Sequence, residues 1–347
     1  MGKFSKKKHF VGVDISKDTL DLSLISQESY GSFKDKQISN TLTSYEEIKE
    51  WLKKEGIGKE EVMFCMEHTG TYGLLFFAWL SQEGYDYCVE PGLQIKRSLG
   101  MVRGKNDRID ARRISDYAYT HKDQLKSFVL PSTLMLQVKQ LLTYRDQLVR
   151  VRTSLKNSVQ SHEQYEVLTG LNEITRGIKR EIEKYGEKIK EIESRIVSIL
   201  EEDSEVKKNF DLSRSVKGVG LVLAAYMLVT TMNYTAFDNG RKYASYAGIA
   251  PFDERSGTSI KVKARTSYLG NKKIKTLLSN GANSAIQWDP EQRAYYKRKK
   301  EEGKDHKVII NAVSCKLVNR VFAVIKRQTP YVITYGHNFS KKDLDIS

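Results

Sequence analysis

The sequence contains little cysteine and little histidine. Its three cysteines, Cys65, Cys88 and Cys315, are widely separated among 347 residues, and its six histidines are scattered. This distribution lacks the closely spaced pairs of a zinc site or a redox motif. Cys65 and Cys88 lie in apolar runs, so we expect them to be buried thiols. The composition therefore favours a cytoplasmic protein without structural disulfides.

Long apolar runs are also missing from the sequence. We expect no segment that is long and apolar enough to cross a bilayer. The first nine residues contain the basic run Lys6-Lys7-Lys8 and no apolar core of the kind that directs secretion. These absences argue against a membrane-spanning or secreted protein.

Positive charge, in contrast, is abundant. Lysine and arginine number 58 against 43 aspartate and glutamate residues, which gives a net charge of +15. Such an excess favours a polyanionic partner, held mainly through phosphate contacts. A merely basic protein and an anionic membrane surface are the weaker alternatives. Nucleic acid is the partner we expect.

The pattern of the chain divides it into three parts, at 1–128, 129–208 and 209–347. In the first part, alternating apolar residues predict five strands, and helical spacing predicts three helices before a fourth that contains 107–110. Ser44 is a plausible N-cap for the first helix. The expected strands are 9–15, 19–25, 33–39, 61–66 and 85–89, and the expected helices are 45–54, 73–82 and one from about 93. This order predicts an α/β fold with a central mixed sheet and helices on its faces, and it is also the order of RNase H-like nucleases.

The second part has the spacing of a coiled coil. From Ile178 to Ile199 the apolar residues step alternately by four and three, and Leu134 begins a similar pattern. We expect a long helical hairpin that can start after Ser132 or Thr133. Its seam can close within one chain or pair with another chain, and the length of the arm favours pairing between chains.

The third part is expected to be mainly helical. A Gly-x-Gly turn at 218–220 precedes the apolar run 221–230, which is typical of a helix-hairpin-helix that contacts phosphate or of an ordinary helix start. The stretch 252–270 shows neither helical nor strand periodicity. Helices are predicted at 271–287 and 306–327.

Four acidic residues stand out in this basic chain. Asp14 and Glu67 each end or interrupt a predicted strand, and Asp107 and Asp110 lie three apart on a predicted helix. Carboxylates brought together repel one another unless a cation lies between them, and oxygen-only ligands favour Mg²⁺ or Mn²⁺. The alternative for any single aspartate is a surface turn residue, and Asp18, Asp21 and Asp116 are competing acids nearby. As a set, the four predict a metal site for phosphate chemistry.

A second candidate for chemistry is Ser256. It precedes Gly257, so flexible backbone can present its hydroxyl to a ligand, and Ser259 would serve almost as well. A polar loop serine is the alternative that residues alone favour. Basic residues follow at alternating positions and could neutralise a phosphate. The nucleic-acid contacts that we predict are Lys105, Arg108, Arg112, Lys217, Gly218, Gly220, Arg255, Lys261, Lys263, Arg265, Asn271 and Lys272.

At these residues the chain resembles the transposases of the IS110 and IS1111 group. The resemblance rests on VGVDISKDTLD, MEHTGTY and KNDRIDARRIS in the first part, and on VKGVG, RKYASYAGIAP, RSGTS and LGNKKIKTLL in the third. It departs from the family pattern at Arg255, where a second serine is usual, at Tyr268-Leu269, where a basic residue is frequent, and at Asn106, where threonine is common.

The resemblance implies a RuvC-like domain, a dimerising coiled coil and a C-terminal transposase domain. It also implies that Asp14, Glu67, Asp107 and Asp110 are the DEDD acids that bind Mg²⁺, and that Ser256 is the nucleophile. Members of this group recombine DNA as oligomers, guided by a structured non-coding RNA that pairs with target and donor DNA. The sequence has no helix-turn-helix or zinc-finger pattern for reading bases, which fits a protein whose target sequence is recognised by the guide RNA.

The function we predict is that of a DNA transposase or recombinase that cleaves and rejoins strands by transesterification. A RuvC-like junction resolvase or nuclease would use the same acids with water as the nucleophile. A non-enzymatic protein that binds RNA or DNA is the third possibility, and it leaves the four acids unexplained. The sequence leaves the choice between Ser256 and Ser259 open, as well as the number of subunits.

Overall fold

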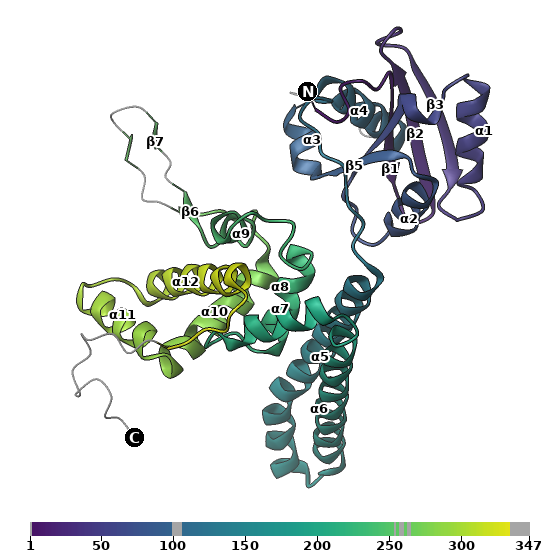
Figure 1. Ribbon diagram of the computed structural model, residues 1–347. Coiled ribbons are helices and arrows are strands. Elements are labelled where there is room, and N and C mark those ends of the chain that lie inside the picture. The colour runs from purple at the N-terminus through teal and green to yellow at the C-terminus, as the bar shows by residue number, and fades with distance from the viewer. Residues whose placement is uncertain (1, 99–105, 253–254, 257–259, 262–264, 334–347) are drawn as a thin grey trace. The chain divides into compact units, whose positions relative to one another are not determined.

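The computed structural model describes residues 2–98, 106–252, 255–256, 260–261 and 265–333 of the chain (Figure 1). The chain forms two compact units, Met1–Leu130 and Pro131–Ser347, and each is described by itself. The long helices of the predicted middle part belong to the second unit. The division of the sequence into three parts remains a prediction.

The first unit is built on one five-stranded sheet. Its strands are β1 (His9–Ile15), β2 (Thr19–Ser26), β3 (Phe33–Ser39), β4 (Val62–Glu67) and β5 (Asp86–Glu90). They lie in the order β3-β2-β1-β4-β5, with β1–β2 and β2–β3 antiparallel and β1–β4 and β4–β5 parallel. This mixed sheet is the RNase H-like, RuvC-like architecture that the sequence predicts.

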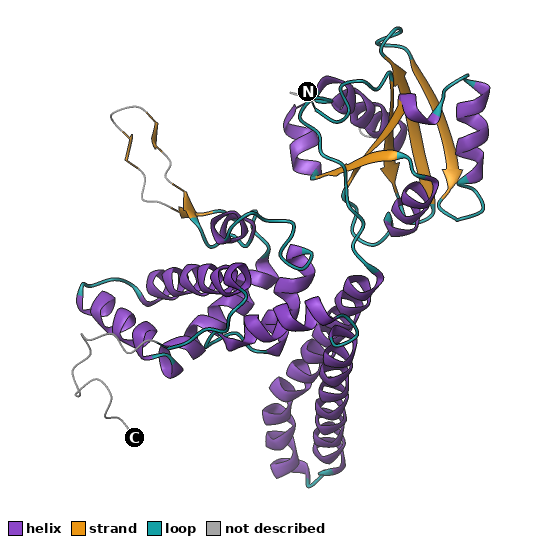
Figure 2. Ribbon diagram, viewed as in Figure 1, coloured by secondary structure: helices purple, strands orange, loops and turns teal. Residues whose placement is uncertain are grey.

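Helices cover both faces of the sheet (Figure 2). The first unit contains α1 (Glu46–Lys54), α2 (Leu74–Glu83), α3 (Gly92–Ser98) and α4 (Asp107–Thr120), and a short 3₁₀ turn, η1 (Lys59–Glu61), precedes β4. Val11, Val13 and Ile15 of β1 belong to the core with α1 and α2. Phe10 belongs to the other core, with residues of α3 and α4. Because neighbouring residues of a strand point to opposite faces, Gly12 and Asp14 share the α3/α4 face with Phe10.

One local prediction in this unit is wrong, and one strand is shifted by a residue from its predicted bounds. The N-cap of α1 is Tyr45 without a side-chain cap bond, and the hydroxyl of Ser44 instead lies 2.8 Å from the hydroxyl of Thr41 in the preceding turn. Strand β4 ends at Glu67, one residue beyond the predicted bound, which confirms that this acid ends a strand. The acid is therefore the last residue of the strand, where the regular backbone fixes the face on which it lies.

Two long antiparallel helices, α5 (Thr133–Thr169) and α6 (Glu173–Leu200), form the arm of the second unit. The hydroxyl of Ser132 caps α5, and Gly170 has a φ of 71° at the end of that helix. Ile189, Ile192 and Ile196 of α6 are buried in one core with residues of α5. These isoleucines thus pack against α5 of the same chain, and pairing of the arm with another chain stays a prediction.

The remaining helices of this unit are α7 (Ser204–Ser215), α8 (Leu221–Thr231), α9 (Gly240–Tyr246), α10 (Lys272–Trp288), α11 (Pro290–Glu301) and α12 (His306–Arg327). Three of them, α7, α9 and α11, had no counterpart in the predicted elements. In the stretch without periodicity, β6 (Pro251–Phe252) pairs with β9 (Arg265–Thr266), and β7 (Arg255–Ser256) pairs with β8 (Ile260–Lys261). Two-residue strands are too short to show an alternating pattern.

Helix α12 corrects the expectation about membrane spans. By length and composition it could cross a bilayer, and it is the one such helix in the described part of the chain. It instead contributes Val313, Leu317 and Val321, all fully buried, to the core of the second unit. Its apolar face is satisfied by packing against α9 and α10.

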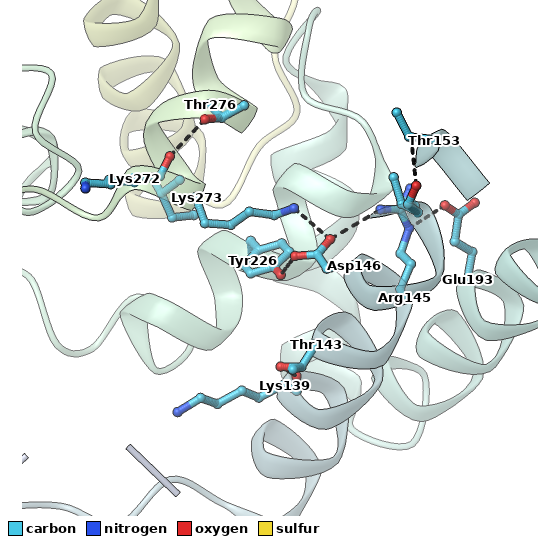
Figure 3. A network of polar contacts seen from close by, with 12 residues as sticks. Lys139, Thr143, Arg145, Asp146, Thr153, Glu193, Tyr226, Lys272, Lys273 and Thr276 are labelled. Carbon is cyan, nitrogen blue, oxygen red and sulfur yellow. Dashed lines mark hydrogen bonds and ion pairs between the residues drawn. The ribbon is translucent and has the colours of Figure 1, made fainter. Parts of the chain in front are cut away.

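A polar network joins the arm to the rest of the second unit (Figure 3). Asp146 of α5 accepts a hydrogen bond of 2.5 Å from the Tyr226 hydroxyl of α8 and forms an ion pair of 2.6 Å with Lys273 of α10. The Asp146 side chain is 10% exposed, so these contacts compensate a largely buried charge. Nearby, Arg145 donates to Glu193 of α6 at 2.7 Å. The network links α5 to the helix that follows the Ser256 segment.

Candidate active site

Three of the acids of the first unit lie on one face of its sheet. Asp14 and Asp21 are directly opposite each other in the β1–β2 register. Cys65 of β4 lies in the α3/α4 core, so Glu67, two residues later, is on that face too. The face is therefore set by the two-residue period of the strands.

Helix α4 brings the other two acids to this face. Its N-cap is Asn106, whose side-chain oxygen accepts a hydrogen bond of 2.9 Å from the backbone N–H of Arg108. Asp107 and Asp110 therefore lie in the first helical turn, where the helix dipole favours negative charge.

Gly12 lets α4 approach the strand closely enough for this arrangement. A Cβ atom at residue 12 would lie 2.2 Å from the carbonyl oxygen of Ala111 and 2.2 Å from the amide nitrogen of Ser115. Both are backbone atoms of α4, so no rotamer change could relieve the overlap. Because Gly12 has no side chain, α4 can pack directly on β1. This contact lies two residues before Asp14 in the same strand.

A second glycine makes room for Glu67. A Cβ atom at Gly92 would lie 1.7 Å from Oε1 of Glu67. The carboxylate thus occupies the space beside the first residue of α3. Substitution at Gly92 would force Glu67 to move.

The electrostatics show that the acids influence one another. Burial, followed by the negative charges of Asp107, Asp110, Glu67 and Asp21, raises the pKa of Asp14 from 3.8 to about 6. Asp110 also receives a hydrogen bond of 2.6 Å from Arg113. The surroundings of Asp14 therefore carry an excess of negative charge, which disfavours its ionised form.

The donor set is suited to a hard divalent cation. All four predicted ligands are carboxylates, and oxygen-only sites favour Mg²⁺ or Mn²⁺. Across the residues that the structure describes, no three His, Cys, Asp or Glu side chains are already gathered closely enough to hold one ion. The carboxylate oxygens and the repulsion among these acids fit a bound cation. The four side chains would have to move closer together to coordinate one ion.

The predicted nucleic-acid contacts of α4 have a partner within the protein. Arg108 and Arg112 both donate hydrogen bonds to Asp35 of β3. These bonds outweigh the effect of burial and lower the pKa of Asp35. Lys105 lies outside the described residues.

In the second unit, Ser256 lies in β7 opposite Ile260 of the antiparallel strand β8. Arg255 and Lys261 are paired on the same two strands, and Arg265 lies in β9. Ser259 and Lys263 lie outside the described residues. The four acids belong to the unit Met1–Leu130 and the serine to the unit Pro131–Ser347.

The Gly-x-Gly turn lies between α7 and α8. Gly218 has a φ of 95°, and a Cβ atom there would lie 2.4 Å from the carbonyl oxygen of Gly281 in α10, so packing already requires this glycine. Gly220 is the N-cap of α8 and is open to the surroundings among the described residues. Lys217 is exposed in the same turn.

Helix α10 contains the last two predicted contacts. Asn271 caps this helix by accepting hydrogen bonds of 3.1 Å from the backbone N–H groups of Lys273 and Ile274. Its side chain therefore has a structural role in the present arrangement. Lys272 is exposed.

Sequence reasoning missed the residues that support the acids. Gly12, Gly92 and Asp35 were not selected, although each contacts an acid or the helix that presents it. A glycine within a strand signals the close approach of another backbone, and Gly12 lies two residues before Asp14. An acid in the edge strand, such as Asp35, is indistinguishable from a solvated residue before the fold is known.

Two family profiles match this chain. Residues 11–164 match a DEDD transposase of the IS110 type, and residues 211–297 match a transposase described as the IS116/IS110/IS902 family. The sheet, the acids and the helical second unit thus define a DEDD transposase. The chain belongs to the IS110/IS116/IS902 family of transposases, as the sequence motifs predicted.

The chain is also similar to individual proteins. The chain is 24% identical over 339 residues to the pilin gene-inverting protein of Moraxella bovis, a match that covers 93% of this chain and 98% of the relative. It is 34% identical over 117 residues to an uncharacterized 43.6 kDa protein of insertion element IS110 from Streptomyces coelicolor, which covers 34% of this chain and 29% of that protein. Among solved structures, RuvC of Thermus thermophilus matches 35% of this chain and 99% of its own, with 11% identity and a TM-score of 0.25.

Proposed function

We propose that this transposase cleaves and rejoins DNA strands through a serine nucleophile, with a divalent cation bound by Asp14, Glu67, Asp107 and Asp110. The observation that supports the cation most directly is the pKa of Asp14, which burial and four neighbouring acids raise to about 6. Acids that repel one another in this way at one sheet face create a field that attracts a cation.

In the proposed reaction, the Ser256 hydroxyl attacks a DNA phosphodiester. A bond forms between Oγ and phosphorus, the bond from phosphorus to the 3′ oxygen breaks, and the hydroxyl proton is transferred to the departing 3′ oxygen. The products are a phosphoserine and a free 3′-hydroxyl. When bound, Mg²⁺ or Mn²⁺ supplies stabilisation of the charge that develops on the phosphate oxygens and the leaving group.

In the proposed reaction, the covalent product would let strand exchange proceed without a nucleoside triphosphate. The phosphoserine retains the bond that a second 3′-hydroxyl attacks, so rejoining is the reverse of cleavage. The roles of the protein are to present Ser256 and to orient the phosphate. Arg255, Lys261, Lys263 and Arg265 are placed by the sequence around this serine, and a basic surrounding would attract the phosphate.

The partners belong to the same proposal. We infer that a structured non-coding RNA guides the protein to target and donor DNA, and that the protein acts as a homo-oligomer in the bacterial cytoplasm. The resemblance to the IS110 and IS1111 group supports the RNA, and the net charge of +15 is suited to two nucleic acids. The Moraxella relatives are named for inverting a pilin gene, which supports a reaction that rejoins DNA.

Trapping the covalent intermediate tests the nucleophile. The protein is incubated with Mg²⁺, the element-encoded RNA and labelled DNA, and the reaction is stopped with denaturant. We expect a labelled protein adduct that Ser256→Ala abolishes and Ser259→Ala retains. An adduct that persists in Ser256→Ala and disappears in Ser259→Ala would assign the nucleophile to Ser259.

The same assay separates recombination from hydrolysis. Asp14→Ala is expected to abolish the adduct and the cleaved strands together, because the acids support the step that forms both. Free cleaved ends without any adduct would indicate a RuvC-like nuclease that uses water. Binding to DNA or RNA without any cleavage would favour the non-enzymatic alternative.

A further inference from the structure

The edge strand β3 holds the helix that carries two of the four acids. Asp35 of β3 accepts hydrogen bonds from Nε and Nη2 of Arg112, at 3.0 and 2.5 Å, and from Nε of Arg108 at 2.5 Å. Its side chain is 7% exposed, against 62% for Arg108 and 37% for Arg112. The carboxylate is thus the buried centre of a clamp between strand and helix, and two N–H groups of one guanidinium give it a defined orientation.

A ring on the same strand face completes the clamp. The guanidinium carbon of Arg112 lies 5.4 Å from the centre of the Phe33 ring. Phe33 and Asp35 are two residues apart, so they point to the same side of β3. Arg112 is therefore confined by a planar ring and by a planar carboxylate, which restricts both its position and its rotation.

The location of the clamp along α4 connects it with the acids. Arg108 and Arg112 are one helical turn apart; Asp110 lies between them, and Asp107 directly precedes Arg108. Gly12 brings Ala111 of the same turn against β1. The turn is thus held from two sides, by backbone packing at β1 and by the Asp35 clamp at β3.

We propose that Asp35 is a positioning residue for the metal-binding acids, which acts through Arg112 and Arg108 to hold Asp107 and Asp110 against Asp14. This inference rests on the proposed function of the four acids. It gives the two arginines a role different from the phosphate contacts that their charge suggested. Both guanidinium groups pair with Asp35, whose carboxylate neutralises one of the two positive charges.

Three variants distinguish the two roles of the arginines. Asp35→Asn keeps the size of the side chain and removes its charge, Arg112→Gln removes the partner, and the double variant removes both. Lys34→Gln is the matched control, because Lys34 lies on the same strand and pairs with Glu55 in an exposed position. All are studied in the full chain at a temperature where circular dichroism shows it to be folded.

Two measurements accompany strand cleavage. The first is the dissociation constant of a labelled DNA duplex that spans one end of the encoding element. The second is a calorimetric titration with Mn²⁺ alone. Outer residues that orient metal ligands typically change metal affinity or activity by about 10–100-fold when they are replaced.

We expect Asp35→Asn and Arg112→Gln each to lower cleavage and Mn²⁺ affinity by about tenfold or more, with the DNA dissociation constant changed by less than about twofold. The double variant should lose no more than Asp35→Asn alone, because that substitution already removes the negative charge with which Arg112 pairs. Lys34→Gln should behave as the unmodified chain.

The opposite pattern would overturn the proposal. If the arginines contact phosphate, Arg112→Gln weakens DNA binding while Asp35→Asn tightens it by releasing both cations, and Mn²⁺ affinity is unchanged. Should Asp35→Asn fail to fold, Arg112→Lys carries the same test, since it keeps the charge and loses the two-point contact. Asp14→Asn, measured in parallel, separates the two proposals: normal cleavage and Mn²⁺ binding in that variant would refute the proposed function itself, whereas its inactivity beside a normal Asp35→Asn would refute only the positioning role.

Discussion

At the scale of single residues, the acids depend on two glycines as much as on their own positions. Gly12 admits the backbone of α4, and Gly92 leaves the space that the Glu67 carboxylate occupies. Neither glycine has a positive φ, so backbone conformation does not require glycine at these positions. Each is required because a side chain there would overlap its neighbours. The geometry around Asp14 is therefore sensitive to a single added methyl group.

The substitution Gly12→Ala tests this sensitivity. Its Cβ atom would overlap Ala111 and Ser115, so we expect the free energy of unfolding to fall by roughly 1–3 kcal/mol and Mn²⁺ binding to weaken. Urea denaturation and calorimetric titration measure the two effects. Gly177→Ala is the control: it lies in α6 with free space around it among the described residues, and it should gain about 0.5–1 kcal/mol. An unchanged stability for Gly12→Ala would contradict the close packing.

Asp14 makes stability depend on pH in the metal-free protein. Its pKa in the folded chain, about 6, lies above the value of 3.8 for an unperturbed side chain, so the folded state binds the proton more tightly. The contribution of this group is fully present below pH 3.8 and is lost as the pH rises through about 6. Its negative charge then opposes folding at neutral pH.

Asp14→Asn should therefore stabilise the metal-free chain at pH 7.5 and have little effect at pH 4. Because the group is partly exposed, screening reduces the expected gain to about 1–2 kcal/mol. Denaturation in the presence of a chelator at both pH values measures it, with the exposed Asp18→Asn as a control. An equal effect at both pH values would show that Asp14 is not destabilised by its neighbours.

At the scale of elements, the seam of the arm closes between α5 and α6. In the C-terminal half of α6, the isoleucines from Ile189 to Ile199 are buried. Near the turn between α5 and α6, Ile178 and Ile182 are only partly buried. The seam is therefore strongest where the arm joins the rest of the second unit. The Asp146 contacts with Tyr226 and Lys273 reinforce the same end.

Replacing a buried seam residue should measure this difference. Ile196 is fully buried, so Ile196→Ala is expected to cost about 2–5 kcal/mol, and Ile182→Ala should cost less because its side chain is already half-exposed. Thermal unfolding at several protein concentrations is the measurement. Because the seam lies within one chain, the loss should not vary with concentration; a loss that shrinks as concentration rises would instead indicate pairing between chains.

At the scale of the whole molecule, the net charge of +15 makes nucleic-acid binding depend on salt. Neutralising phosphates releases counterions, so affinity for duplex DNA should fall linearly on a plot of log affinity against log salt concentration. The basic residues do not contribute equally. Many, such as Lys184 with Glu181, are paired with acids on the protein surface.

The exposed Lys217, in the turn between α7 and α8, provides the test. We expect Lys217→Gln to weaken DNA binding and to reduce the salt slope by about 0.9, the value for one lost phosphate contact. Lys184→Gln in the arm removes the same charge from an ion pair and should leave the slope unchanged. Fluorescence anisotropy at several salt concentrations measures both. Equal effects of the two substitutions would mean that net charge alone governs binding.

The regular elements could be predicted from the sequence because their periods are local. Strands β1 and β3 and helix α12 have the predicted bounds, since alternation and helical spacing are complete within each segment. Helices α7, α9 and α11 were missed because their apolar residues are few and gain their meaning only from the core they contact. The short strands around Ser256 had too little length to produce a period.

The sequence by itself determined the family and the positions of Asp14 and Glu67 at the ends of strands, and it predicted the four acids as a set. Residue type and a period of two are properties of the chain before it folds. Only the tertiary structure decided that α4 lies on Gly12, that Glu67 fills the space beside Gly92, and that Asp35 holds Arg108 and Arg112. Those contacts join residues that are distant in sequence, and a pairing of this kind depends on how sheet and helix pack, which no local pattern encodes.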